Sequence, residues 1–415
     1  MRARLTLISV IAFFLKAVVA ISVIGQEPIK DLKPTVILIS IDGFRWDYLD
    51  KHKPVELNRL AKEGVRAKWM IPAFPTKTFP NHYTIATGLY PEKHGIVENN
   101  IWHFGVTFSM GNRTEVENSR WWLGEPIWVT AEKQGVRAAA FFFPGTETEI
   151  AGKRPTFWKP FDDKFPNEAR VDQILAWLDL PVAERPQMFT LYFSDVDHAG
   201  HDFSPESTET GVAVQAVDKM IERLVTGLKA RRIGKDVNLI VVSDHGMAAV
   251  NQRNAVIMDD YLNRELAERV ITTGEIWQIF PKSGQEDAIM KGLRTIKNAV
   301  CWRKNEIPKR LHYRASPRIA PIICSAEEGW FMTSRERHEQ QKKRADFAQT
   351  RGAHGYDNVL ASMRATFIAH GRAFKQNRIV EPFENIHVYE LMCKILKLKP
   401  APNDGDLSRV KKMLR

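Results

Sequence analysis

The sequence predicts an α/β fold in which a largely parallel central sheet lies between layers of helices. Three apolar runs of strand length support this prediction, at residues 36–41, 189–193 and 239–242. Strands that are buried on both faces of a parallel sheet need such continuous apolar sequence. Helix-like segments separate the runs, and this alternation favours a parallel over an antiparallel sheet.

The helices are predicted from their boundary residues and from apolar periodicity. Three of them begin at or near a proline and are followed by glycine, which suits a helix start and a helix end respectively. A fourth, longer segment carries Val, Ile and Leu on one face at helical spacing. The expected helices cover residues 55–62, 80–87, 126–133, 209–230 and 386–396. Residues 365–369 are expected to add another strand.

Residues 250–350 have a less regular pattern than the rest of the chain. Apolar residues such as Trp302 stand there among many charged ones. We therefore expect an inserted lobe over about residues 250–350, within one catalytic domain that spans residues 34–405.

The first 25 residues have the layout of an export signal. Arg2 and Arg4 precede an apolar run over residues 5–15, and small residues follow. Lys16 interrupts the run, which argues against a membrane-spanning helix. We expect residues 1–25 to be a signal peptide or an N-terminal anchor. The protein would then be exported, periplasmic or secreted, with membrane attachment only if the leader stays uncleaved.

Composition limits the classes of partner. Apolar residues make up 44% of the chain and charged residues 26%, so the chain can bury a core. The formal net charge of +11 favours anionic substrates, although it could equally be a solubilising excess. Lysine and arginine are spread widely rather than gathered among aromatics, so no dedicated nucleic-acid module is expected.

The three cysteines leave two alternatives open. Cys301 and Cys324 could form a disulfide in an oxidising compartment, or they and Cys393 could all be buried thiols. None of them belongs to a CxxC motif, so a cysteine-bound zinc is excluded.

Acidic and imidazole side chains follow each of the three apolar runs. Asp42 follows the first, Asp197 and His201 come shortly after the second in an expected loop, and Asp244 and His245 follow the third. Parallel strands present their carboxyl ends at one edge of the sheet, where ligands bind. Oxygen and nitrogen ligands without thiolate suit Zn²⁺ or Mn²⁺, and their number is sufficient for two ions. The pattern predicts a metallo-hydrolase.

Thr78 and His354 are candidate functional residues only in combination with this metal site. Thr78 lies just before the helix expected from Pro80, where free backbone N–H groups stabilise negative charge. A threonine hydroxyl is a weak nucleophile without a metal, so helix capping is its ordinary role. His354 stands in a loop close to glycines, where an isolated histidine would usually face water.

Taken together, these residues resemble the nucleotide pyrophosphatase/phosphodiesterase family, a branch of the alkaline phosphatase superfamily. The resemblance runs over residues 34–405 and covers the catalytic domain only. It implies an alkaline-phosphatase-like fold with the inserted lobe. The matching motifs are at residues 38–45, 75–84, 87–96, 244–247 and 354–358.

The resemblance implies two bound Zn²⁺ ions and assigns their ligands. One ion would be held by Asp197, His201 and His354. The other would be held by Asp42, Asp244, His245 and the Thr78 hydroxyl.

The resemblance also assigns substrate contacts. Asn99 and the backbone N–H of Phe79 would hold a phosphoryl oxygen. Phe79 and Tyr192 would line the nucleotide pocket, and Met110 takes a position where an aliphatic side chain is usual.

The implied reaction cleaves phosphodiester or pyrophosphate bonds of nucleotide-type small molecules through a phosphothreonine intermediate on Thr78. Two rivals share the metal core, namely a choline-lipid phosphodiesterase and a phosphonate or phosphomonoester hydrolase. A non-catalytic, metal-stabilised exported binding protein is the rival from another class.

Overall fold

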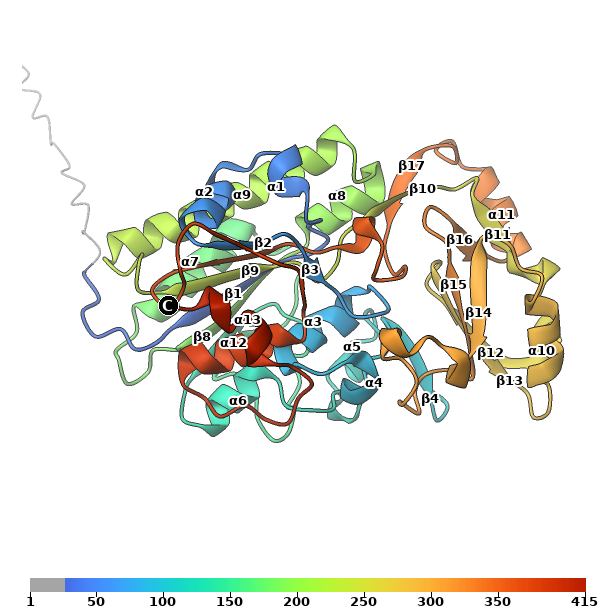
Figure 1. The fold of residues 1–415 in the computed structure, drawn as a ribbon, viewed down its shortest axis with the longest axis horizontal. Helices are drawn as coiled ribbons and strands as arrows, with labels where there is room; N and C mark the ends of the chain where they lie inside the picture. The colour runs from blue at the N-terminus through green and yellow to red at the C-terminus, as the bar shows by residue number, and fades with distance from the viewer. Residues whose placement is uncertain (1–26) are drawn as a thin grey trace, which may run out of the picture.

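The computed structural model describes residues 27–415, so the predicted leader lies outside the described residues. An eight-stranded sheet forms the centre of the molecule, in the order β19-β2-β18-β9-β1-β8-β6-β7 (Figure 1). Only β18 runs against its neighbours, so the predicted α/β fold with a largely parallel sheet is confirmed. The strands are β1 (Val36–Ile41), β2 (Val65–Ala67), β6 (Ala138–Phe141), β7 (Phe157–Lys159), β8 (Met188–Phe193), β9 (Asn238–Val242), β18 (Phe367–His370) and β19 (Arg378–Val380).

Side chains of β1 alternate between two hydrophobic cores. Val36 and Leu38 belong to one core, whereas Ile37, Ile39 and Ile41 belong to the other. Successive strand residues point to opposite faces, so a strand at the centre of a two-faced sheet must be apolar throughout. This requirement explains why the run was recognisable from sequence.

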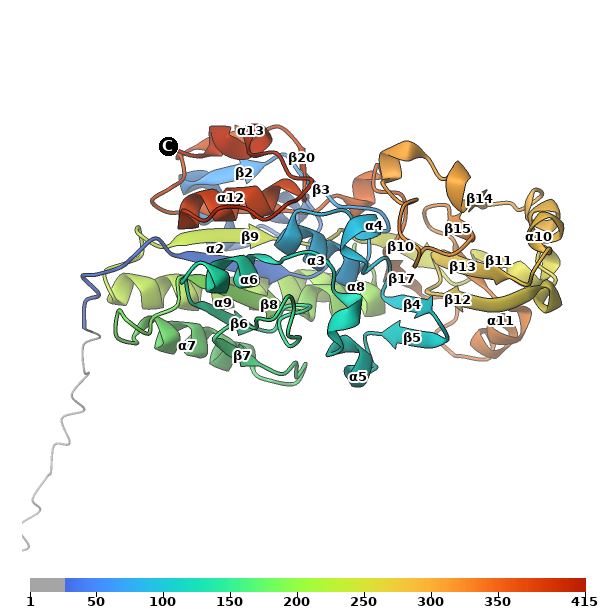
Figure 2. The ribbon, with the colours of Figure 1, turned by 90° about the horizontal axis from the view of Figure 1, so that it is seen from below.

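Helices cover both faces of the sheet (Figure 2). On one face lie α3 (Thr78–Thr87), α6 (Ile127–Lys133) and α12 (His387–Leu396). The other face carries α2 (Val55–Glu63), α7 (Asn167–Leu178) and α9 (Thr208–Ala230). None of the helices described over residues 27–415 has the length and apolar character needed to cross a membrane.

Two paired strands connect residues 251–350 to the catalytic core. These are β10 (Ala248–Asn251) and β17 (Thr350–Ala353), which run antiparallel with Ala248 opposite Ala353. We use the name lobe for residues 251–350. The lobe lies beside the end of the central sheet (Figure 1).

The lobe is regular in structure, although its sequence pattern is less regular than that of the rest of the chain. It contains an antiparallel four-stranded sheet in the order β12-β13-β15-β14, with a third hydrophobic core of its own. Strands β12 and β13 form a hairpin, whereas β15 pairs with both β13 and β14, and its pairing with β13 spans a long stretch of sequence. The four strands are β12 (Ala267–Thr272), β13 (Ile276–Pro281), β14 (Ala299–Arg303) and β15 (Ile322–Ala326). Helix α10 (Glu286–Leu293) lies between β13 and β14 in sequence, and α11 (Arg335–Lys342) comes after β15.

A disulfide links Cys301 of β14 to Cys324 of β15, directly opposite it in the register. Cys393 is a buried free thiol. Of the two alternatives for the cysteines, the structure therefore has the bridge.

Candidate metal centre and active site

The carboxyl ends of three central strands bring the predicted ligands together. Ile41 lies opposite Phe193 in the register of β1 and β8, and Ser40 lies opposite Val242 in that of β1 and β9. The residues that follow these strands therefore meet at one edge. The backbone N–H of Asp42 donates to the Phe193 carbonyl at 2.9 Å, which extends the ladder to the first ligand position.

Asp197 and His201 lie on a helix rather than in the expected loop. Helix α8 (Asp195–Phe203) starts directly after β8 and places positions i and i+4 on one face. His201 Nε2 lies 3.5 Å and His354 Nε2 3.7 Å from Asp197 Oδ1. The ligand atoms of these three residues all lie within 4.8 Å of one another.

Hydrogen bonds orient both imidazoles for ligation. Nδ1 of His201 is 2.9 Å from the Gly352 carbonyl, and Nδ1 of His354 is 2.8 Å from the Thr76 carbonyl. A carbonyl can only accept, so each Nδ1 carries the proton and each Nε2 presents its lone pair to the shared space. Second partners of this kind fix the tautomer of metal-binding histidines.

The second predicted group forms beside the first. His245 Nε2 lies 3.0 Å from Asp244 Oδ2, 3.4 Å from Asp42 Oδ1 and 3.4 Å from Thr78 Oγ1. Asp42, Asp197 and His245 also come within 4.8 Å of one another. The two groups are therefore adjacent, and Thr78 lies at the edge of the second.

Gly246 is needed for a close backbone approach rather than for an unusual turn. A Cβ at this position would collide with the carbonyl oxygen of Ser362. The glycine thus lets residues 244–246 lie against the loop before β18.

Within the two ligand groups, three buried carboxylate oxygens lack a hydrogen-bond donor: Asp42 Oδ1, Asp197 Oδ1 and Asp244 Oδ2. Each unpaired buried anion is costly, and a divalent cation relieves that cost. All three atoms belong to the clustered ligand groups. The donor set of carboxylates and imidazoles therefore fits bound divalent metal ions, and metal-binding Asp/His groups are present.

The crowding of charged groups at the site shifts the pKa values of its residues. Burial, with the charges of Asp244 and Asp197, raises the pKa of Asp42 well above its usual range. Burial, with His245, Lys77 and His201, holds the pKa of His354 well below its usual range. His354 is therefore a neutral imidazole, the form that binds metal.

Thr78 is the first residue of α3 and not the residue before it, because the helix begins two residues earlier than expected from Pro80. The Phe79 N–H donates to Asn99 Oδ1 at 2.9 Å. This bond fixes the Asn99 amide beside Thr78, and its Nδ2 group has no protein acceptor among the described residues.

His82 belongs to the site, although it was not among the predicted ligands. Its ligand atom comes within 4.8 Å of those of Asp42 and Asp244. However, Nε2 lies 2.7 Å from Ser40 Oγ and Nδ1 lies 2.9 Å from the Thr78 carbonyl. Both ring nitrogens are thus already engaged, and His82 supports the backbone of Thr78.

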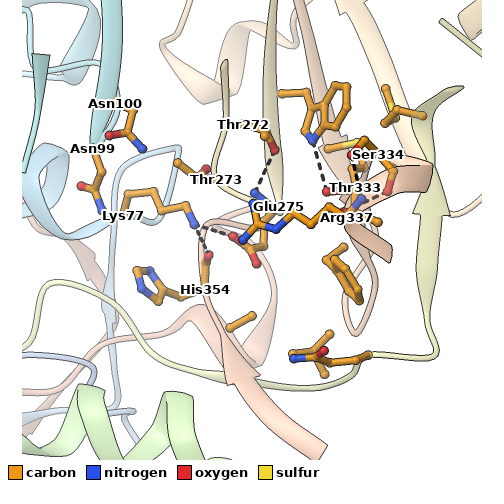
Figure 3. Close-up of a pocket in the computed structure, with 18 of the residues that line it drawn as sticks. Lys77, Asn99, Asn100, Thr272, Thr273, Glu275, Thr333, Ser334, Arg337 and His354 are labelled. Carbon is orange, nitrogen blue, oxygen red and sulfur yellow. Dashed lines mark hydrogen bonds and ion pairs between the residues drawn. The ribbon is translucent and has the colours of Figure 1, made fainter. Parts of the chain in front are cut away.

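A contact between the lobe and the loop before α3 was not foreseen from the sequence. The Lys77 ammonium bonds to Glu275 Oε2 at 2.5 Å and to the His354 carbonyl at 2.7 Å, in a buried position (Figure 3). Thr273 lies two positions before Glu275 in the same hairpin, and its hydroxyl donates to Glu98 Oε1 at 2.9 Å. The β12–β13 hairpin is thereby attached to the residues beside Thr78 and Asn99.

The aromatic residues expected at the nucleotide pocket differ in accessibility. Phe79 is half-buried against Phe108 and Trp122. Tyr192 is buried, and its hydroxyl donates to Asp42 Oδ2 at 2.7 Å. Phe161, which was not predicted, lies 6.1 Å from Tyr192 between ring centroids and is 41% exposed.

Comparisons with known proteins identify the family. The family model described as type I phosphodiesterase / nucleotide pyrophosphatase matches residues 36–357. This chain belongs to that family. It is 40% identical over 396 residues to "Venom phosphodiesterase CdcPDE" of Crotalus durissus collilineatus, covering 92% of the chain and 46% of the relative. It is 37% identical over 397 residues to "Ectonucleotide pyrophosphatase/phosphodiesterase family member 3" of Rattus norvegicus, covering 92% and 44%. The chain thus spans less than half the length of these curated relatives.

Solved structures agree with this assignment. Human ectonucleotide pyrophosphatase / phosphodiesterase 5 matches with a TM-score of 0.86 and 34% identity, over 92% of this chain and all of that one. An inactive form of the murine protein, solved in complex with AMP, matches with a TM-score of 0.85 and 34% identity over the same shares. The predicted alkaline-phosphatase-like fold is confirmed by these matches.

Proposed function

We propose that this protein is a two-zinc hydrolase that cleaves phosphodiester or pyrophosphate bonds of nucleotide-type substrates through a phosphothreonine on Thr78. The observation that carries the proposal is the position of the Thr78 hydroxyl, 3.4 Å from His245 at the edge of two adjoining ligand groups. Asp197, His201 and His354 would hold one ion, and Asp42, Asp244, His245 and Thr78 the other.

Bound ions would lower the pKa of the Thr78 hydroxyl and stabilise charge on the leaving oxygen. The Thr78 oxygen then attacks phosphorus, and the start of α3 favours the negative charge that develops on the phosphoryl oxygens. Asn99 is held by Phe79 with its Nδ2 group free to donate to one of those oxygens. Water later cleaves the phosphothreonine and restores the hydroxyl.

Aromatic side chains support a nucleotide as the group that is transferred. Tyr192 contacts Asp42, and the exposed Phe161 lies beside Tyr192. Phe79 follows Thr78 in α3, and Met110 lies in the wall of the adjoining cavity. The murine relative that matches this chain was solved with AMP. The buried Tyr192 acts chiefly on Asp42, so Phe161 is the better candidate for stacking on a base.

We also propose that the protein is exported from the cytoplasm. The Cys301–Cys324 disulfide is the kind that forms in oxidising compartments. The matched relatives are named as a venom enzyme and as an ectonucleotide enzyme. Export, with residues 34–405 as the catalytic domain and the lobe inserted in it, remains our proposal.

A release assay tests the function directly. Wild-type protein should cleave a p-nitrophenyl nucleotide ester faster than p-nitrophenyl phosphate or p-nitrophenyl phosphorylcholine, and elemental analysis should find close to two zinc ions. Thr78→Ala should abolish turnover while the fold and most bound zinc are kept. Thr78→Ser is the matched control, since it retains a hydroxyl and should retain measurable turnover. Unchanged turnover in Thr78→Ala would exclude Thr78 as nucleophile.

A further inference from the structure

The lobe holds the backbone on both sides of Asn99. The hydroxyl of Tyr313, a lobe residue, donates to the Val97 carbonyl at 2.8 Å. The Nε2 group of Gln278, on lobe strand β13, donates to the Asn100 carbonyl at 2.7 Å. Two lobe side chains thus fix the chain two residues before Asn99 and one residue after it.

The Glu98 side chain provides a third connection to the lobe. It is fully buried, and its Oε1 atom accepts from the Thr273 hydroxyl at 2.9 Å. Its Oε2 atom accepts from the backbone N–H of Asn100 at 2.8 Å. Figure 3 shows Asn99 and Asn100 with Thr273 of the lobe beside them. The lobe therefore contacts both chain neighbours of Asn99, while the Asn99 side chain itself bonds to Phe79 in the catalytic core.

The alternation of side chains along β13 explains why Gln278 reaches the catalytic core. Successive residues of a strand face opposite sides of the sheet. Trp277 and Ile279 belong to the hydrophobic core of the lobe, whereas Ile276 belongs to the core on the α3 face of the central sheet. Gln278 shares the side of Ile276 and is only 1% exposed. One face of the lobe sheet is thus packed on the catalytic core, and Gln278 is a polar residue within that contact.

A buried glutamine at this position is not required by packing. Gln278 Oε1 has no hydrogen-bond partner among residues 27–415, and an unpaired buried polar atom destabilises the fold. An apolar side chain of similar size, such as methionine, would fill the same space without that cost. However, it could not donate to the Asn100 carbonyl. The structure therefore favours a role for Gln278 in holding the backbone beside Asn99.

We propose that Gln278 and Tyr313 are positioning residues, through which the lobe holds Asn99 ready to bind a phosphoryl oxygen. They act through the backbone of residues 97–100 and not on the substrate itself. A donor stabilises the charge that develops on a phosphoryl oxygen most strongly when it is already in place before the reaction. The lobe thus contributes to catalysis by fixing a donor that belongs to the catalytic core. The inference rests on the proposed function, in which Asn99 donates to that oxygen.

The test uses a p-nitrophenyl nucleotide ester in which sulfur replaces one of the two non-bridging oxygens, so that two diastereomers exist. In one diastereomer oxygen faces Asn99, and in the other sulfur does, which is the weaker hydrogen-bond acceptor. In Gln278→Met the ratio of kcat/KM for the first diastereomer to that for the second should fall about three- to tenfold. This is part of the hundredfold or more, on the order of magnitude, that one such donor supplies. Tyr313→Phe should shift the ratio in the same direction.

Ile279→Val is the matched control for a general loss of stability. Ile279 is the neighbour of Gln278 but faces the lobe core, so the ratio should stay at the wild-type value. In an Asn99→Ala background, Gln278→Met should not change the ratio further, because Gln278 acts through Asn99. An equal shift in Ile279→Val, or an unchanged ratio in Gln278→Met and Tyr313→Phe with both diastereomers still cleaved, would overturn the inference and leave the proposed function intact. Failure of the wild type to cleave the ordinary oxygen ester would overturn the proposed function itself.

Discussion

Removal of the Glu275 carboxylate should weaken both the fold and the reaction, because Glu275 neutralises the buried cation next to Thr78. The side chains of Lys77 and Glu275 are only 5% and 10% exposed, and their charged atoms are 2.5 Å apart. Breaking such a pair leaves a buried charge and costs about 3–5 kcal/mol. The His354 carbonyl still accepts from Lys77, so the lower end, about 3 kcal/mol, is expected for Glu275→Ala.

This loss should appear as a lower unfolding free energy in urea and a Tm lower by roughly 4 °C. The kcat for a nucleotide ester should fall by about tenfold to a hundredfold, since a shift of Thr78 by about 1 Å is enough for such a loss. Glu268→Ala is the control, because Glu268 lies on the same lobe sheet with its side chain exposed.

A paired replacement separates charge from position. The double variant Lys77→Met with Glu275→Leu removes both charges, so its stability should recover most of the loss. Its kcat should stay low, because the lobe no longer holds the loop before α3 through a directed bond. Wild-type Tm and kcat in Glu275→Ala would refute this account of the contact.

Three further predictions concern His94, Tyr192 and Phe161. Burial lowers the pKa of His94 to about 3. Below pH 6.5 the unfolded chain therefore takes up a proton at His94, whereas the folded chain does not. The unfolding free energy consequently decreases as the pH falls below 6.5. At pH 5 the unfolding free energy is lower by about 2 kcal/mol because of His94. In His94→Gln the unfolding free energy, measured in urea, should depend less on pH between 6.5 and 4. Tyr192→Phe removes the hydroxyl that donates to Asp42. The affinity for zinc, measured by competition with a chelator, should therefore fall about tenfold or more. An unchanged zinc affinity would contradict the role assigned to the Tyr192 hydroxyl. Phe161→Ala should lower kcat/KM for a nucleotide ester more than for a small diester without a base, and equal losses would exclude base stacking.

The clustering of the candidate metal ligands was predictable because several of them follow strands that have to be apolar on both faces. Asp42 comes directly after β1, and Asp244 and His245 come within three residues of the end of β9, so local sequence places them at one edge of the sheet. Helix α8 was missed because Asp197, His201 and their neighbours are weak helix formers with a glycine among them. Tertiary contacts of α8 with α9 and β17 stabilise it instead.

The contacts between the lobe and the catalytic core could not be predicted from the sequence. The bond between Lys77 and Glu275 joins residues 198 positions apart, and it exists only because the β12–β13 hairpin folds back over the site. The short strands β6 and β7 were missed for a related reason. Ala138–Phe141 is rich in alanine, which has no strand preference, and becomes a strand through its neighbour β8.

The stereochemistry of hydrolysis at phosphorus tests the central claim most directly. A nucleotide ester with a chiral phosphorothioate centre can be hydrolysed in ¹⁸O-labelled water and the configuration of the product determined. Attack by Thr78 followed by attack of water consists of two in-line displacements, so the account predicts net retention of configuration. Net inversion would show a single displacement by water and would contradict a phosphothreonine intermediate.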